Sequence, residues 1–251
     1  MSNMSPLLRL LGRGALAGAL AGLLATAVSF LLGEPSINEA IALEEAAAHA
    51  DGGEHAAEVF SRATQQFGLG VASVLTGAAV GLIFALVYAI RHREDPAADP
   101  WRRSLWLATA GFVGLSLIPF LRYPAQPPAV GDPATIDFRS QIYLGALLIG
   151  AAAVTAAWQL HRRLLERGAA PQLRQLAAVA VVLVGLAATF LLPGNPDPNE
   201  APAELIWSFR VGSLAAIATV WFGLGAIFGL LSLRAAATAK RRDADHADAA
   251  V

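Results

Sequence analysis

The sequence predicts an all-α integral membrane protein, a six-helix transmembrane bundle with both termini in the cytoplasm. Two observations support this prediction: six long apolar runs, and basic residues that gather on one side of those runs. A helix needs about 20 apolar residues to cross a hydrocarbon core of about 30 Å, and lipid offers no hydrogen-bond partner to an exposed backbone. Each run therefore predicts one span, and the spans are residues 14–32, 67–90, 104–121, 142–160, 176–192 and 211–233.

The basic residues predict the orientation of these spans. If the N-terminus is inside, fourteen of the 18 Lys and Arg residues are cytoplasmic, and the four outside are Arg62, Arg122, Arg139 and Arg210. Twelve of the 19 acidic residues fall outside. Because loops rich in Lys and Arg stay in the cytoplasm, this bias predicts a multi-pass protein of the inner (plasma) membrane, surrounded by its lipid bilayer.

The first span follows Arg9 and Arg13, a pattern that it shares with secretory signal peptides. Its apolar run, residues 14–32, is longer than the about 7–15 residues usual in a signal peptide, so we interpret it as a retained helix. If it were cleaved, five spans would remain.

Glycines at a spacing of four predict where helices pack closely. The first span has Gly14, Gly18 and Gly22, and the second has Gly77 and Gly81. Small residues at this spacing let two backbones approach each other. The sixth span repeats the pattern with Gly225 and Gly229. The pattern leaves open whether the partner helix belongs to this chain or to another.

The remaining spans are bounded by proline, aromatic and basic residues. The third run closes at Pro119, which we expect to lie at the outer boundary, because proline lacks an N–H donor and disfavours a continuing helix. The fourth and fifth runs are joined by a short arginine-rich loop, and Trp and Tyr near span ends suit the membrane interface. Residues 1–233 form one predicted transmembrane domain, and residues 234–251, rich in Ala and charge, a disordered cytoplasmic tail.

The composition argues against several classes of function. The chain has no cysteine, which excludes disulfides and thiolate metal sites. No HExxH motif and no Walker A loop occur, and Lys240 is the single lysine. Ser73 and Ser116 have no His, Asp, Glu or Lys at a matching depth to act as a base. We therefore predict no enzyme, no cofactor and, since the basic clusters flank spans, no nucleic-acid partner.

The acidic external segment, residues 33–66, is the richest cluster of metal-ligating residue types. Ser36 and Glu39 match a capping box, which predicts a helix over about 37–50, and Glu45 and His49 share a face of it. Gly52 and its neighbour predict a bend before a second helical stretch. Imidazole and carboxylate together suit Co²⁺, Ni²⁺ or Zn²⁺. The candidate ligands are Glu44, Glu45, His49, Asp51, Glu54, His55 and Glu58, and the alternative is a solvated acidic loop.

The other two external segments combine basic and acidic residues. Their main members are Arg122, Asp132, Arg139, Glu204 and Arg210. One interpretation is that ion pairs fasten the external loops together, with Arg210 paired to Glu204 or Asp197. The other is an outer vestibule whose net acidity concentrates cations.

Three stretches of the chain resemble the CbtA family of predicted cobalt transporter subunits. They are GEPSI and AIALEEA (33–37 and 40–46), FLRYPAQPPAVGDP (120–133), and LPGNP with LIWSFR (192–196 and 205–210). The resemblance covers nearly the whole chain and implies inward transport of Co²⁺ for cobalamin synthesis. It also implies a small single-span partner, CbtB, with a His-rich metal motif of its own. The alternative is a non-transporting scaffold or accessory subunit, and the oligomeric state stays open.

The spans offer few ligands to a crossing metal ion. A double charge gains about 4.6 kcal/mol per 100 mV of membrane potential, so no ATPase is required in principle. Hydroxyls are weak ligands for a dehydrated Co²⁺, so we expect a hydrated ion or a path shared with a partner. The span hydroxyls that such a path would use are Thr26, Ser29, Ser73, Thr76, Thr109, Ser116, Thr189, Ser213 and Thr219.

The orientation can be tested because the chain has no cysteine of its own. We expect the variant Asp51→Cys to react with a membrane-impermeant maleimide in right-side-out membrane vesicles, since segment 33–66 is predicted outside. The variant Arg163→Cys, predicted inside, should react only after the vesicles are permeabilised. The reverse pattern would show that the orientation is wrong.

Overall fold

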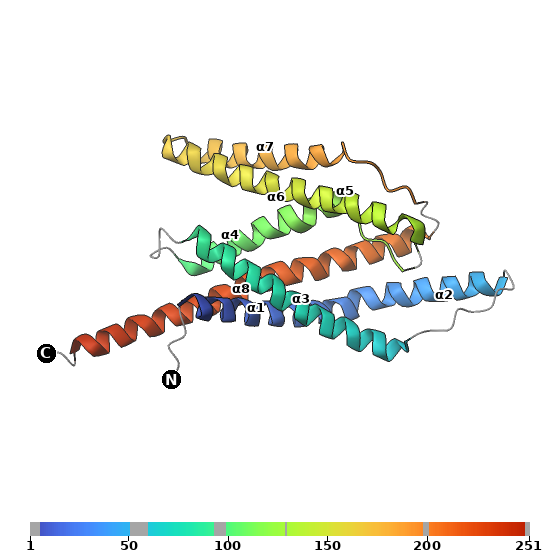
Figure 1. Cartoon of the computed structure of the whole chain (residues 1–251), viewed down its shortest axis with the longest axis horizontal. Coiled ribbons are helices and arrows are strands. Elements are labelled where there is room, and N and C mark those ends of the chain that lie inside the picture. Colours follow the sequence, from blue (N-terminus) through green and yellow to red (C-terminus); the bar gives the residue numbers. More distant parts are fainter. Residues whose placement is uncertain (1–5, 51–59, 93–98, 129, 198–200, 249–251) are drawn as a thin grey trace. The chain divides into compact units, whose positions relative to one another are not determined.

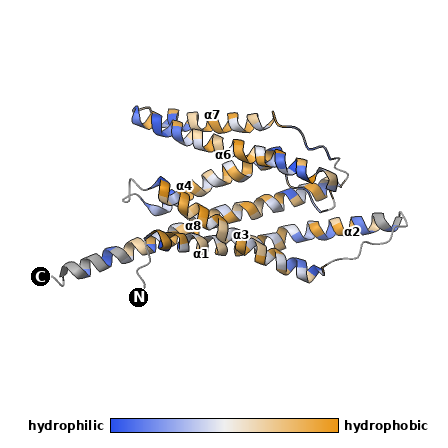
Figure 2. Ribbon diagram, in the orientation of Figure 1, coloured by the Kyte–Doolittle hydropathy of each residue, from blue (hydrophilic) through white to orange (hydrophobic). Residues whose placement is uncertain are grey.

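A computed structural model describes residues 6–50, 60–92, 99–128, 130–197 and 201–248. Figures 1 and 2 show the chain as helices without strands in this described part, with hydrophobic residues along the helices. Six helices are long and apolar enough to cross a membrane, which confirms the predicted class. They are Pro6–Ala46, Arg62–Arg91, Pro100–Arg122, Pro133–Glu166, Pro171–Thr189 and Ala203–Thr238.

The described residues form two compact units within the predicted transmembrane domain. The first unit draws on Met1–Val28, Glu58–Thr109 and Ala216–Val251, and the second unit on Ser29–Ala57 and Ala110–Ala215. Each is described below on its own.

Two glycine-rich helices form the centre of the first unit, α1 (Pro6–Val28) and α3 (Arg62–Arg91). A Cβ atom added to Gly18 of α1 would collide with the carbonyl oxygen of Gly77 of α3, and the reverse also holds. Gly14 and Gly81 face each other in the same way. The predicted close packing is therefore confirmed, and both helices belong to this chain.

The core of the first unit lies beside this contact. It adds residues from α4 (Pro100–Phe112) and from the C-terminal part of α8 (Ala203–Asp248). Phe84 and Phe228 are almost fully buried, and their ring centroids lie 5.3 Å apart in an edge-to-face arrangement. Gly225 of α8 packs against Ala108 of α4, so the glycines of the sixth span also serve close packing.

The second unit contains the elements η1 (Ser29–Gly33), α2 (Glu34–Ala50), η2 (Val113–Leu117), α5 (Ile118–Arg122), η3 (Pro133–Thr135), α6 (Ile136–Glu166), α7 (Pro171–Thr189) and the start of α8. Helices α6 and α7 pack along each other through Gly185 and Ala153. Gly168, with φ of +71°, ends α6: its N–H donates to Leu165 O at 3.0 Å, and Ala169 N–H donates to Leu164 O at 2.9 Å. This pair of bonds is a Schellman motif, which turns the chain directly into α7.

Two prolines lie inside helices where the sequence predicts helix ends. Pro35 sits in α2 and Pro119 in α5, and each follows a π-helical turn, η1 or η2. A proline ring clashes with the carbonyl four residues earlier, and here those carbonyls, of Leu31 and Leu115, lie in the wider π turns. The helix therefore continues past both prolines.

This continuity corrects the predicted capping box. Ser36 does not start a helix, because it lies within α2 and is buried, and its hydroxyl donates to Ser208 Oγ at 3.1 Å. The helix that starts at Pro6 runs through η1 into α2, so no loop separates the first span from the acidic segment.

The tail also differs from the prediction of disorder. Helix α8 continues to Asp248, through residues 235–239, which are Ala and Thr. Alanine has the highest helix propensity, and a helix already formed by the sixth span needs no new nucleation.

Substitution of Gly18 tests the contact between α1 and α3. We expect Gly18→Ala to lower the free energy of unfolding by about 1–3 kcal/mol, because the new methyl meets backbone atoms that cannot move aside. The measurement is thermal unfolding of the purified protein in detergent. The matched control is Gly12→Ala on the same helix, where a Cβ meets nothing within 4 Å. Equal stability of the two variants would contradict the proposed contact.

Candidate functional site

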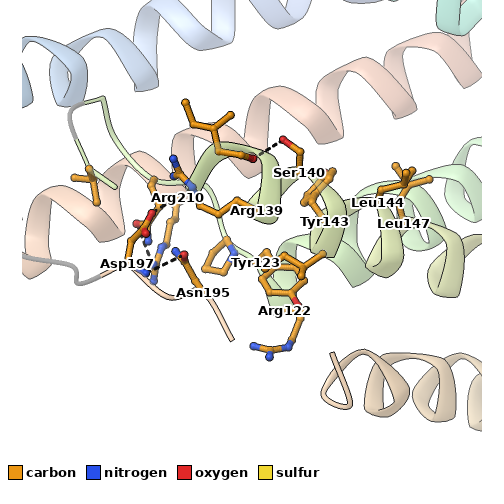
Figure 3. Close-up of a pocket in the computed structure, with 15 residues that line it drawn as sticks. Arg122, Tyr123, Arg139, Ser140, Tyr143, Leu144, Leu147, Asn195, Asp197 and Arg210 are labelled. Carbon is orange, nitrogen blue, oxygen red and sulfur yellow. Dashed lines mark hydrogen bonds and ion pairs between the residues drawn. The ribbon is translucent and has the colours of Figure 1, made fainter. Parts of the chain in front are cut away.

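The second unit contains an open cavity of about 810 Å³. Figure 3 shows Arg139 and Arg210 close to Asn195 and Asp197, whereas Leu144 and Leu147 of α6 lie at the opposite end of the cavity. The lining also includes three of the four arginines that the sequence places outside, Arg122, Arg139 and Arg210. The partners of these three side chains decide what the cavity can do.

Arg122 is bound to the end of α7. Its Nε donates to Thr189 O at 3.1 Å, and its Nη2 donates to Leu192 O at 2.8 Å and to Pro193 O at 2.9 Å. The last carbonyls of a helix have no intrahelical partner and carry partial negative charge, so a guanidinium satisfies them well. Arg122 therefore fastens α5 to the C-terminal end of α7.

Tyr123 strengthens the same junction. Its hydroxyl donates to Pro193 O at 2.6 Å, and the Arg122 guanidinium lies 4.7 Å from the centre of its ring. The guanidinium also lies 5.3 Å from the ring centre of Phe190. An arginine held between two aromatic rings and three carbonyls has one well-defined position.

Arg139 binds Asp197, the one carboxylate among the described residues that line the cavity. Its Nε lies 3.2 Å from Asp197 Oδ2, and the Asp197 side chain is 3% exposed. The Thr135 hydroxyl lies 2.8 Å from Asp197 Oδ1. The negative charge of Asp197 is therefore compensated inside the protein.

The turn before α6 is shaped to allow this ion pair. Gly131 has a φ of +111°, and a Cβ there would come within 2.7 Å of Asp197 Oδ2. The Asp132 carboxylate accepts the N–H of Ala134 at 2.8 Å and so caps η3, while the Asp132 carbonyl accepts Arg139 Nη2 at 3.2 Å. Asp132 thus serves the turn and does not line the cavity.

The contacts of Arg210 differ from its predicted pairing with Glu204 or Asp197. Its Nε donates to Ala125 O and its Nη2 to Gln126 Oε1, both at 3.3 Å, whereas Asp197 is paired with Arg139. Glu204 is exposed and lies six residues before Arg210 on α8, and side chains face each other on a helix at spacings of three or four. Glu204 lies in the first turn of α8, where a negative charge complements the helix dipole.

These bonds favour the loop-fastening interpretation over an acidic vestibule. The described residues of the cavity lining carry three guanidinium groups and one carboxylate, which is already paired. Such a lining does not attract a free divalent cation. Sequence reasoning missed Tyr123, Thr135 and Gln126 as parts of this arrangement, although the adjacent Asp132–Pro133 pair signals a turn.

A comparison with protein families decides what the chain is. The model of the CbtA family, described as "Probable cobalt transporter subunit", matches residues 7–232 of the 251. The chain belongs to the CbtA family. Neither the comparison with curated proteins nor that with solved structures gave a match. The matched residues of this CbtA-family chain include the first five predicted spans, the sixth as far as residue 232, and every described residue of the cavity lining.

The predicted metal ligands of this CbtA-family chain are only partly described. Glu44, Glu45 and His49 are exposed residues of α2, with Glu45 and His49 four residues apart. Among the residues that the structure describes, no three His, Asp or Glu side chains are grouped to hold a metal ion. The other candidates, Asp51, Glu54, His55 and Glu58, lie outside the described residues, so the cluster stays a prediction.

Several span hydroxyls are engaged within their own helices. Thr26 donates to Gly22 O at 2.9 Å, Thr109 to Leu105 O at 2.9 Å and Thr189 to Leu186 O at 2.6 Å. Hydroxyls bonded to the preceding turn are typical of packing positions in helices. Only their oxygen lone pairs remain for a ligand.

The role of Arg122 can be tested by substitution. We expect Arg122→Gln to reduce the free energy of unfolding by about 2–4 kcal/mol, because charge-assisted bonds to three carbonyls are lost. The variant Arg122→Lys should recover little of this loss, since an ammonium lacks the planar fork. The control is Arg163→Gln, whose exposed side chain lies on α6 outside the cavity. A loss no larger than that of the control would contradict the fastening role.

Proposed function

We propose that this chain is the multi-pass subunit of a transporter that carries Co²⁺ into the cell and supplies cobalamin synthesis. The observation that carries the proposal is the match to a family of probable cobalt transporter subunits across residues 7–232. Six helices of membrane-spanning length support it. The family is one of transporter subunits, and we propose no catalytic activity and no resident cofactor for this chain.

The proposed substrate would first meet the protein along α2. On the orientation predicted from the arginines, α2 faces the outside, and it carries Glu44, Glu45 and His49 as exposed side chains. Because an oxygen and an imidazole nitrogen on one helix face form a weak site for a borderline divalent ion, we propose that these residues raise the local cobalt concentration. Asp51, Glu54, His55 and Glu58 would complete the cluster.

Passage through the membrane needs more than the spans of this chain provide. No Asp, Glu, Lys, Arg or His occupies the centre of a predicted span, and three span threonines are bonded to their own helices. We propose that the ion crosses in hydrated form or along a path shared with a second subunit such as CbtB. The membrane potential supplies about 4.6 kcal/mol per 100 mV for a double charge.

The same observations support one alternative, a scaffold or accessory subunit that holds a metal-binding partner. The cavity of the second unit is lined with arginines that fasten loops, as a structural subunit would require. Cobalt accumulation tests both proposals. Cells that contain this chain alone, the chain with CbtB, CbtB alone, or neither are compared at low external cobalt. If cells accumulate cobalt only when they contain both the chain and CbtB, the result fits a shared path and a scaffold equally. The scaffold is excluded only if cells with the chain alone accumulate cobalt. No uptake in any strain contradicts cobalt transport.

The two histidines of the acidic segment, residues 33–66, make a separate prediction. We expect the double variant His49→Ala and His55→Ala to reduce cobalt uptake at low external cobalt by about tenfold or more, because loss of even an outer-shell partner of a metal ligand costs about 10–100-fold in metal affinity. Uptake at saturating cobalt should change little. The control is His161→Ala, a histidine on α6 that the orientation places inside. Unchanged uptake at low cobalt would show that these two side chains are not ligands.

A further inference from the structure

The first unit contains a second cavity, unrelated to the cobalt proposal. It has a volume of about 1040 Å³ and lies between the start of α1, the end of α3 and α8. Arg9 and Arg13 line it from α1, Leu86 and Ile90 from α3, and Thr238 from α8. All of these residues belong to the same compact unit.

Among the described residues that line this cavity, the two arginines are the only charged ones. They are four residues apart and therefore share one face of α1, where two like charges repel each other. Neither forms an ion pair with a carboxylate in the described part of the chain. Arg13 is half-buried, which makes an uncompensated charge more costly there than at an exposed position. The arrangement therefore favours an anionic occupant that contacts both guanidiniums.

The rest of the lining is apolar and open to the surroundings. Leu7 is 47% exposed, Leu86 45% and Ile90 67%, and all three line the cavity beside the arginines. Thr238 adds a hydroxyl, but it already donates to Arg234 O at 3.0 Å. A soluble anion gains nothing from such walls, whereas a molecule with a phosphate and hydrocarbon chains matches both parts of the lining.

The position of the cavity agrees with a lipid. It lies where α1 begins and α3 ends, at the boundary between the hydrocarbon layer and water for two candidate spans. The basic residues of the chain predict the cytoplasmic side for this boundary, the side on which basic pockets between spans bind anionic headgroups.

We propose that this cavity binds an anionic phospholipid, with the phosphate on Arg9 and Arg13 and one acyl chain along Leu86 and Ile90. The lipid would compensate the two positive charges and fill the space between α1, α3 and α8. The bound lipid would therefore stabilise the first unit against unfolding. This site is independent of any metal and of the second unit's cavity.

The experiment uses the full-length purified protein in nanodiscs of phosphatidylcholine, with or without phosphatidylglycerol. We expect phosphatidylglycerol to raise the melting temperature of the wild type by several degrees, and the double variant Arg9→Gln and Arg13→Gln to lose this increase. The control is Arg163→Gln with Arg167→Gln, two arginines with the same spacing and the same predicted side that do not line the cavity. It should keep the increase.

Native mass spectrometry gives a second measurement that does not depend on the stability of a variant. We expect the wild type to retain phosphatidylglycerol over phosphatidylcholine, and the single variant Arg9→Gln to retain it about fivefold less, since each basic residue near anionic lipid contributes about a fivefold factor in binding. Equal retention of the two lipids would overturn the proposal. So would an equal stabilisation by inorganic phosphate in phosphatidylcholine nanodiscs, because the site would then accept a soluble anion without a lipid chain.

Discussion

Every backbone N–H and C=O within a hydrocarbon layer needs a hydrogen-bond partner from the protein itself, and this requirement shapes the whole chain. It explains why the apolar runs are helices, and why two prolines are accommodated by π turns in continuous helices. It also explains the behaviour of the threonines Thr26, Thr109 and Thr189, whose hydroxyls donate to carbonyls of the preceding turn. The spans are therefore satisfied internally and offer little to a passing ion.

The same requirement explains why the arginines at the span ends have different roles. Arg122 donates to backbone carbonyls at the end of α7, Arg210 donates to the carbonyl of Ala125, and Arg139 compensates Asp197. These bonds hold the second unit together and leave its cavity unsuited to a free cation. In the first unit, Arg9 and Arg13 line a cavity without a carboxylate, so their charge remains available to an anion. The arginines of the two units therefore differ in whether the described part of the protein supplies them with a carbonyl or carboxylate partner, although all of them are the same residue type.

These features give a consistent view of a subunit in the CbtA family. The chain supplies apolar spans, tightly packed through Gly18 and Gly77, together with an acidic segment on α2. It supplies few metal ligands along the spans. A protein built in this way agrees with the family description as a transporter subunit.

The sequence by itself determined the helical class, the six spans and the glycine positions that pack, because run length and four-residue spacing are local properties. It failed at Ser36, predicted to start a helix, and in the tail, predicted to be disordered, because in both places the preceding helix continues. The sequence also identified the external arginines of the second unit, but it did not identify the groups to which they bind. Only the tertiary structure decided that Asp197 binds Arg139 and that Arg210 binds the loop at Ala125, because these pairs depend on which distant segments meet at the span ends.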